Sequence, residues 1–393
     1  MSLWHKLVFA LLIGITSADA AYKYFGLGGI AVYTLLCIAF VLIVARPKVI
    51  GWLDSAITER SSLLIAAAIF AALIAACLLI YPYADSGQLG DRGSDADDAL
   101  VIGAQAVLHG DYPFYQTTYY GNPIAPMPGA IILAIPFAAK PFIVLQNIFW
   151  LGALFWLCGR ELKNWRVALL LLLSLLVLCP AVAQNLLTAT DRLSNVTYIL
   201  VAMWLLVRNG DGARAPWWHE TLAAVLLGIG LSSRSNFFFL VPILAVVLIR
   251  SGGWTRATRS LAIAGATFLA VTLPFWIYDP TAFSPFLVQT DKMAQFDSTL
   301  PHASVVVALS GMALAIILAV RRANTDLASF FMSCGLVQLY SVLLLSAIST
   351  AHTGKLDLYF GHVSYGVFAL VFFMLAGAIR LNEMSPANDE QPR

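Results

Sequence analysis

Residues 61–82 read SSLLIAAAIFAALIAACLLIYP, an apolar run without a single charged side chain. A helix needs roughly 20 such residues to cross the hydrocarbon core of a bilayer. Similar runs recur along the whole chain, which is 60% hydrophobic and only 11% charged. Only helices and closed barrels satisfy their backbone in lipid, and the alternating pattern of a barrel is absent. The sequence therefore predicts an all-α polytopic membrane protein.

About twelve transmembrane helices are expected from the apolar runs. They are placed at 4–20, 26–45, 61–82, 141–159, 167–184, 193–207, 219–233, 236–249, 260–277, 302–320, 327–348 and 359–379. The apolar stretch 127–139 is too short for a further span, and we expect a re-entrant or interfacial helix there. Residues 1–381 then form one transmembrane module, with an uncleaved N-terminal hairpin, and 382–393 form a disordered cytoplasmic tail.

Basic residues gather between the predicted spans. The clusters are Arg46/Lys48/Arg60, Arg160/Lys163/Arg166, Arg208/Arg214, Arg250/Arg256/Arg259, Arg321/Arg322 and Arg380. One side of the membrane accommodates all of them, and by the positive-inside rule that side is cytoplasmic. We expect an integral protein of a bacterial inner membrane, with both termini in the cytoplasm. The five cysteines lie within apolar runs, so they are expected to be small core residues without disulfides.

The loop that follows the run, residues 83–126, is the most polar external segment. It holds six aspartates and one basic residue, which are Asp85, Asp91, Asp95, Asp97, Asp98, Asp111 and Arg92. Within it, 99–109 forms the pattern of an interfacial amphipathic helix that ends at Gly110. Helix capping and hydration account for one or two of these carboxylates. The rest, beside an apolar helix and a tyrosine-rich stretch, favour a binding pocket.

Two stretches resemble the GT-C type of integral-membrane glycosyltransferase, in its mannosyltransferase-like branch. The first comprises Asp95-x-Asp97-Asp98, then AVLHGDYPFY at 106–115 and the proline-rich segment 123–136. The second is GIGLSSRSNFFFLVP at 228–242, in which Arg234 replaces the commoner lysine followed by proline. The Gly-Gln pair that usually follows the fifth span is also changed, to Ala183-Gln184-Asn185.

The resemblance implies transfer of a sugar from a polyprenyl-phosphate donor to a lipid or glycan acceptor on the external, periplasmic face. Asp95 would be the general base, while Asp97 and Asp98 would orient the acceptor. No metal is assigned, although a divalent cation at Asp95, Asp97 and Asp98 is an open alternative. Arg234 would clamp the donor phosphate, unless it is only a helix-end arginine that reaches the interface. Further substrate-binding candidates are Arg192, Tyr112, Tyr115, Tyr119, Asn122, His302 and Lys355.

Some of these residues have simpler explanations. Asp191 and Arg192 could form a structural ion pair, and a lone histidine such as His302 is more often a satisfied hydrogen-bonding residue. Two other functions also stay open, a transporter or flippase of lipid-linked sugars and an enzyme of the O-antigen ligase or polymerase kind. The expected partners are the lipid-linked donor, its acceptor and the bilayer, and no nucleic acid.

Overall fold

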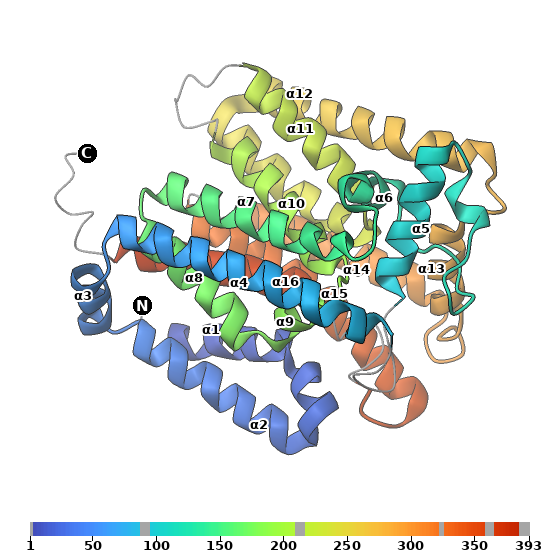
Figure 1. Cartoon of the computed structure of the whole chain (residues 1–393). Coiled ribbons are helices and arrows are strands. Elements are labelled where there is room, and N and C mark those ends of the chain that lie inside the picture. Colours follow the sequence, from blue (N-terminus) through green and yellow to red (C-terminus); the bar gives the residue numbers. More distant parts are fainter. Residues whose placement is uncertain (1–2, 87–94, 209–216, 322–325, 358–364, 385–393) are drawn as a thin grey trace.

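The computed structural model describes residues 3–86, 95–208, 217–321, 326–357 and 365–384, which form a bundle of helices without a β-strand (Figure 1). The α-helices are α1 (Leu3–Thr16), α2 (Ala18–Val44), α3 (Pro47–Ala56), α4 (Glu59–Asp85), α5 (Ala96–His109), α6 (Pro128–Ala134), α7 (Leu145–Leu162), α8 (Trp165–Leu178), α9 (Pro180–Leu187), α10 (Arg192–Arg208), α11 (Trp217–Leu231), α12 (Val241–Tyr278), α13 (Ser284–Ala294), α14 (Ala303–Arg321), α15 (Leu327–Thr353) and α16 (Gly366–Glu383). Short 3-10 helices are η1 (Pro113–Tyr115), η2 (Ile135–Phe137), η3 (Phe142–Val144) and η4 (Ser235–Leu240).

Seven of the described helices are long and apolar enough to cross a membrane. They are Phe25–Val44, Glu59–Asp85, Phe142–Leu162, Ser235–Tyr278, Ala303–Arg321, Leu327–Thr353 and Gly366–Glu383. An eighth results if α8 and α9, which meet at an angle of 84°, count as one broken span. The predicted class, a polytopic helical membrane protein, agrees with this architecture.

The predicted number of twelve spans stays a prediction. The expected spans at 4–20, 193–207 and 219–233 correspond to α1, α10 and α11, with 14, 17 and 15 residues. The expected spans 236–249 and 260–277 both fall within α12, which is kinked at Gly253, where φ is 78°. That value belongs to the left-handed region, which glycine adopts without steric cost.

The middle of the bundle is built on α10 and α16, which are buried along almost their whole length. Helices α7, α11 and α12 pack beside α10, while α8 and α15 pack beside α16. Aromatic rings fill the centre, as where Trp204 meets Phe331 edge to face with centroids 5.7 Å apart. Helices α4 and α14 instead turn apolar residues such as Leu79 and Leu309 outward, at 70% and 66% exposure. Such an outer surface suits a lipid environment.

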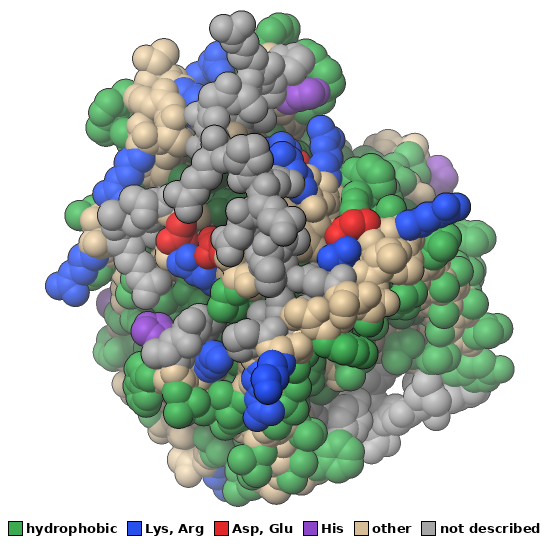
Figure 2. Space-filling model, turned by 90° about the vertical axis from the view of Figure 1, so that its left-hand side faces the viewer, with side chains coloured by type: hydrophobic (Ala, Val, Ile, Leu, Met, Phe, Trp, Pro, Cys, Tyr) green, Lys and Arg blue, Asp and Glu red, His purple; other side chains and the backbone are tan. Residues whose placement is uncertain are grey.

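One end of the bundle, called the basic end here, is joined by ion pairs and hydrogen bonds between helix termini. They are Arg166–Glu59, Arg208–Glu161, Arg259–Glu220, Arg380–Asp326 and Asn164–Asn382. These contacts join the first turns of α4 and α8 to each other, α11 to the middle of α12 just after its kink, α7 to the end of α10, and the end of α16 to the starts of α8 and α15. Figure 2 views this end, with Lys and Arg side chains spread over it. Several of the predicted basic clusters therefore do share one end of the molecule.

The acidic loop and its return lie at the opposite end. Helix α5 begins at Ala96, three residues before the predicted start, and ends as expected at Gly110, whose φ is 81°. The stretch expected to be re-entrant or interfacial forms the short helices α6 and η2. Helix α6 packs against α5, α11 and α12, and the Gly129 amide donates to the Ser232 carbonyl at 2.8 Å. At the C-terminus α16 continues to Glu383, and residues 385–393 of the expected tail lie outside the described ranges.

Candidate functional site

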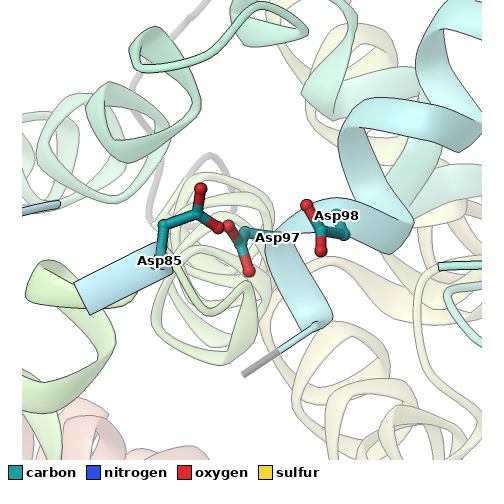
Figure 3. A group of neighbouring side chains, drawn as sticks. All are labelled: Asp85, Asp97 and Asp98. Atoms are coloured by element: carbon teal, nitrogen blue, oxygen red, sulfur yellow. The ribbon is translucent and has the colours of Figure 1, made fainter. Parts of the chain in front are cut away.

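Three aspartates from two helices converge at the end of the bundle opposite the basic end (Figure 3). Asp85 is the last residue of α4, while Asp97 and Asp98 lie in the first turn of α5. One carboxylate oxygen from each lies within 4.8 Å of the others. Asp97 and Asp98 are only 1% and 4% exposed. Because buried carboxylates are costly unless they are paired, we name these three residues the acidic centre and ask what neutralises them.

Lys140 is the counter-charge of the acidic centre. Its Nζ lies 2.9 Å from both carboxylate oxygens of Asp85. It also forms an ion pair with Asp98 Oδ1 at 2.6 Å. The same ammonium is 5.1 Å from the centroid of the Tyr119 ring. The sequence left open a divalent cation at Asp95, Asp97 and Asp98. In the structure the three carboxylates close enough to share a cation are those of Asp85, Asp97 and Asp98. Such a cation would have to replace the Lys140 ammonium.

Asp97 has one oxygen occupied and one free. Its Oδ2 accepts a hydrogen bond from the Tyr81 hydroxyl at 2.5 Å, whereas its Oδ1 has no hydrogen-bond partner among the described residues. Burial raises the pKa of Asp97 to about 7; the Asp98 charge adds to the rise, while Tyr81 and Lys140 oppose it. Burial also raises the pKa of Asp98. A carboxyl group that titrates near neutral pH is suited to taking up a proton and giving it back.

Asp95, the predicted general base, has a different position. Its Oδ2 accepts from Asn122 Nδ2 at 2.6 Å and from the Thr118 hydroxyl at 2.9 Å. The Thr118 amide in turn donates to the Asn122 carbonyl at 2.9 Å. Asp95 and Asn122, both predicted to act on substrate, thus connect the start of α5 to the returning loop. Asp111 lies beyond the other end of α5, and Asp91 lies outside the described residues.

The predicted tyrosines divide into two groups. The Tyr112 hydroxyl donates to the carbonyls of Phe275 and Asp279 at 2.8 and 3.2 Å, and the Tyr115 hydroxyl donates to Asp279 Oδ2 at 2.9 Å. Both therefore attach the loop to the end of α12. Tyr119 is 80% exposed and lies over Lys140, so it is the predicted tyrosine that adjoins the acidic centre.

A second charged cluster, the arginine centre, forms where α9, α10, α11 and α16 end or begin. Arg234 Nη2 donates to both oxygens of Asp191 at 2.7 and 2.6 Å. Asn195 Nδ2 donates to the same carboxylate at 2.9 Å. The guanidinium carbon of Arg192 lies 4.9 Å from the centroid of the Tyr365 ring. The residue that pairs with Asp191 through hydrogen bonds is thus Arg234, and not Arg192 as considered from the sequence.

The arginine centre holds two positive charges and one negative charge. Asp191 is 1% exposed, and burial alone would raise its pKa; the guanidinium groups of Arg234 and Arg192 hold the pKa below its ordinary value. The Nε atoms of Arg192 and Arg234 have no hydrogen-bond partner among the described residues. Two guanidinium groups with unused donors and one carboxylate leave a net positive charge, which favours an anionic ligand.

The two centres are connected by packing. Helix α5, which carries Asp97, packs on α6, and α6 is bonded through Gly129 to Ser232, two residues before Arg234. The predicted water-filled chamber shared by Asp97 and Arg234 stays a prediction. A cavity of about 510 Å³ lies at the basic end, and one of about 430 Å³ flanks the end of α12.

His302 and Lys355 occupy exposed positions near the start of α14 and the end of α15. Neither side chain contacts the acidic centre or the arginine centre within the described ranges. By contrast, Asp85, Tyr81 and Lys140 were not among the predicted site residues. Lys140 offered a signal in the sequence, because it is a lysine in a segment predicted to lie on the external side, where the positive-inside rule disfavours lysine.

Comparison of this chain with protein-family models, with curated proteins and with solved structures found no match.

Proposed function

We propose that the protein is a membrane glycosyltransferase that takes a sugar from a polyprenyl-phosphate donor. The acceptor would be a hydroxyl group of a lipid or glycan at the end of the bundle that carries the acidic centre. The observation on which this proposal depends is Asp97, a buried carboxyl group whose Oδ1 has no hydrogen-bond partner among the described residues and whose pKa is about 7. A general base works best when its pKa lies near the operating pH.

In the proposed reaction, Asp97 Oδ1 accepts the proton of the acceptor hydroxyl while that oxygen attacks the anomeric carbon of the donor sugar. The new glycosidic C–O bond forms as the bond between the anomeric carbon and the phosphate oxygen breaks, with inversion at the anomeric carbon. The lipid phosphate leaves with the electron pair. Asp97 then returns its proton to water. Asp97 is preferred to Asp95 because Asp95 Oδ2 connects α5 to the returning loop through Thr118 and Asn122, whereas the pKa of Asp97 lies at about 7.

The departing phosphate needs positive charge, and the arginine centre supports this part of the proposal. The positive charges of Arg234 and Arg192 act on one carboxylate there, and their Nε donors have no hydrogen-bond partner in the described part of the chain. Fixed donors aimed at developing negative charge stabilise a transition state without further reorganisation. We propose that Arg234 and Arg192 bind the donor phosphate and that Asp191 holds Arg234 in place. Tyr119, exposed over Lys140, is the proposed surface for a sugar ring.

The test is an assay of purified protein with a panel of polyprenyl-phosphate sugars, measuring donor consumption for wild type and Asp97→Asn. We expect the variant to lose at least about a hundredfold in rate, since it cannot take up the proton. In wild type the rate should rise as the pH increases through about 7, because the base must be ionised. Asp111→Asn, beyond the far end of α5, is the matched control and should keep full activity. Full activity of Asp97→Asn would refute the assignment.

A transporter of lipid-linked sugars is the second candidate, favoured by the 84° break between α8 and α9. Discontinuous helices commonly line substrate sites in transporters. The same assay separates the two functions, because a transporter would move a labelled lipid-linked sugar across proteoliposomes without consuming it.

A further inference from the structure

The largest cavity named above lies far from both charged centres, at the basic end. Its volume is about 510 Å³, and it is enclosed by α1 and α2 on one side and by α8, α15 and α16 on the other. Leu171 of α8, Met332 of α15 and Met374 of α16 typify its apolar lining. Polar groups of His5, Ser329 and Arg380 occur where the walls reach the basic end. The cavity is thus an apolar groove with a polar mouth.

The depth of the groove matches one leaflet of a bilayer. On α1 its lining runs from Trp4 to Ile13, and nine steps of helical rise give about 14 Å. That is close to half of a hydrocarbon core about 30 Å thick. On α8 the lining runs from Val167 to Ser174, again in the turns nearest the basic end. On α2, α15 and α16 the lining residues lie in the part of the helix nearest the basic end, while on α1 they cover most of this short helix, so the groove reaches across about the leaflet on that side.

The mouth of the groove carries positive charge. Lys6 Nζ donates to the carbonyl of Ala45, a residue of the lining, at 3.1 Å, and Arg46 follows it as an exposed residue. Trp4, at 72% exposure, marks the level at which aromatic residues meet lipid headgroups. Arg380 pairs with two carboxylates, those of Asp326 and Glu383, which more than offset its charge. Lys6 and Arg46 therefore provide the charge that favours an anionic headgroup.

We propose that this groove binds one acyl chain of an anionic glycerophospholipid from the leaflet at the basic end, with its phosphate beside Lys6 and Arg46. The lipid fills the space between the α1–α2 hairpin and the rest of the bundle. This site is independent of the glycosyltransferase proposal, because none of its residues belongs to the acidic or the arginine centre.

The test is native mass spectrometry of the detergent-purified full chain, titrated separately with phosphatidylglycerol and with phosphatidylcholine of identical acyl chains. Wild type should bind one phosphatidylglycerol saturably and more tightly than phosphatidylcholine. Leu171→Trp puts an indole into the groove and should weaken that binding at least about tenfold, since it displaces two or more buried methylene groups. Leu173→Trp, on the same helix at 37% exposure and outside the lining, is the matched control and should bind like wild type.

Two further variants keep the result interpretable. Ser174→Phe fills the deeper part of the groove and should weaken phosphatidylglycerol binding as Leu171→Trp does. Gel-filtration elution and melting temperature show whether each variant folds, and one folded variant is enough for the test. Arg46→Gln leaves the groove open and should reduce the preference for phosphatidylglycerol about fivefold. Equal binding of both lipids by wild type would overturn the proposal. Unchanged phosphatidylglycerol binding by a folded groove-filling variant would also overturn it. A dimer mass that Leu171→Trp abolishes would do the same, because a second copy of the chain would then occupy the groove.

Discussion

At the level of single residues, opposing interactions with its surroundings set the pKa of Asp97. Burial favours the neutral acid, whereas the Tyr81 hydroxyl and the Lys140 ammonium favour the ionised form. The folded-state pKa, about 7, lies above the unfolded value of about 3.9. The contribution of this group to stability is therefore present below about pH 4 and is lost as the pH rises through about 7.

Tyr81→Phe tests that balance. Removing the hydroxyl takes away a hydrogen bond that favours the carboxylate, so the pKa of Asp97 should rise above its present value of about 7. A charge-assisted hydrogen bond of about 1.5 kcal/mol or more corresponds to roughly one pKa unit. We expect the rising limb of the pH–rate profile to move to higher pH by about that amount. Tyr83→Phe, an exposed tyrosine of the same helix, is the control and should leave the profile unmoved.

Asp191→Asn tests the arginine centre. The change leaves Arg234, whose side chain is 18% exposed, without its carboxylate. Breaking a buried pair by removal of one partner costs about 3–5 kcal/mol, and the partial exposure of Arg234 favours the lower end. Thermal unfolding in detergent measures the loss. The double variant Asp191→Leu with Arg234→Met should recover part of the stability but not the affinity for the lipid donor. If Asp191→Asn melts like wild type, the pair does not support the fold.

At the element scale, α5, α6 and the end of α11 must stay in contact for the two centres to act together. At Gly129 the backbones of α6 and α11 come very close together, because a Cβ atom at this position would lie 2.1 Å from the Ile229 carbonyl oxygen and 2.8 Å from the Ser232 carbonyl carbon. The short apolar helix after the loop thus needs a glycine for packing. Backbone atoms cannot give way as a flexible side chain can.

Gly129→Ala should therefore separate α6 from α11. We expect a loss of about 1–3 kcal/mol in unfolding free energy, as for other overpacked sites, together with a fall in donor consumption. Gly265→Ala is the matched control, since a Cβ atom there meets nothing within 4 Å on α12. That control should be neutral or slightly stabilising. Equal behaviour of the two alanine variants would show that the contact of α6 with Ser232 is dispensable.

At the scale of the whole molecule, the two ends of the bundle differ in chemistry. Ion pairs between helix termini join the basic end, while the acidic and arginine centres lie towards the other. By the positive-inside rule the basic end should face the cytoplasm. The proposed chemistry would then take place on the external side.

Cysteine labelling tests this orientation. Tyr119→Cys and Arg160→Cys introduce thiols at exposed positions. Tyr119 is 80% exposed as a residue, and the Arg160 side chain is 67% exposed. The five native cysteines are buried. A membrane-impermeant maleimide should label Tyr119→Cys in intact cells and Arg160→Cys only after lysis, and the cysteines of wild type should stay unlabelled. The opposite pattern would place the acidic centre in the cytoplasm.

The helical membrane class and the common end of several basic clusters were predictable from the order of the residues. That order also indicated α5 and its Gly110 end to within a few residues. These features depend on local hydrophobicity, charge and backbone preference, which are legible along a chain. The tertiary structure alone decided which carboxylates are buried together and which cations face them. Lys140 and Asp85 are 55 residues apart, and Arg234 and Asp191 are 43 apart. No local pattern encodes such pairs, because helix packing and desolvation select them only once the bundle has formed.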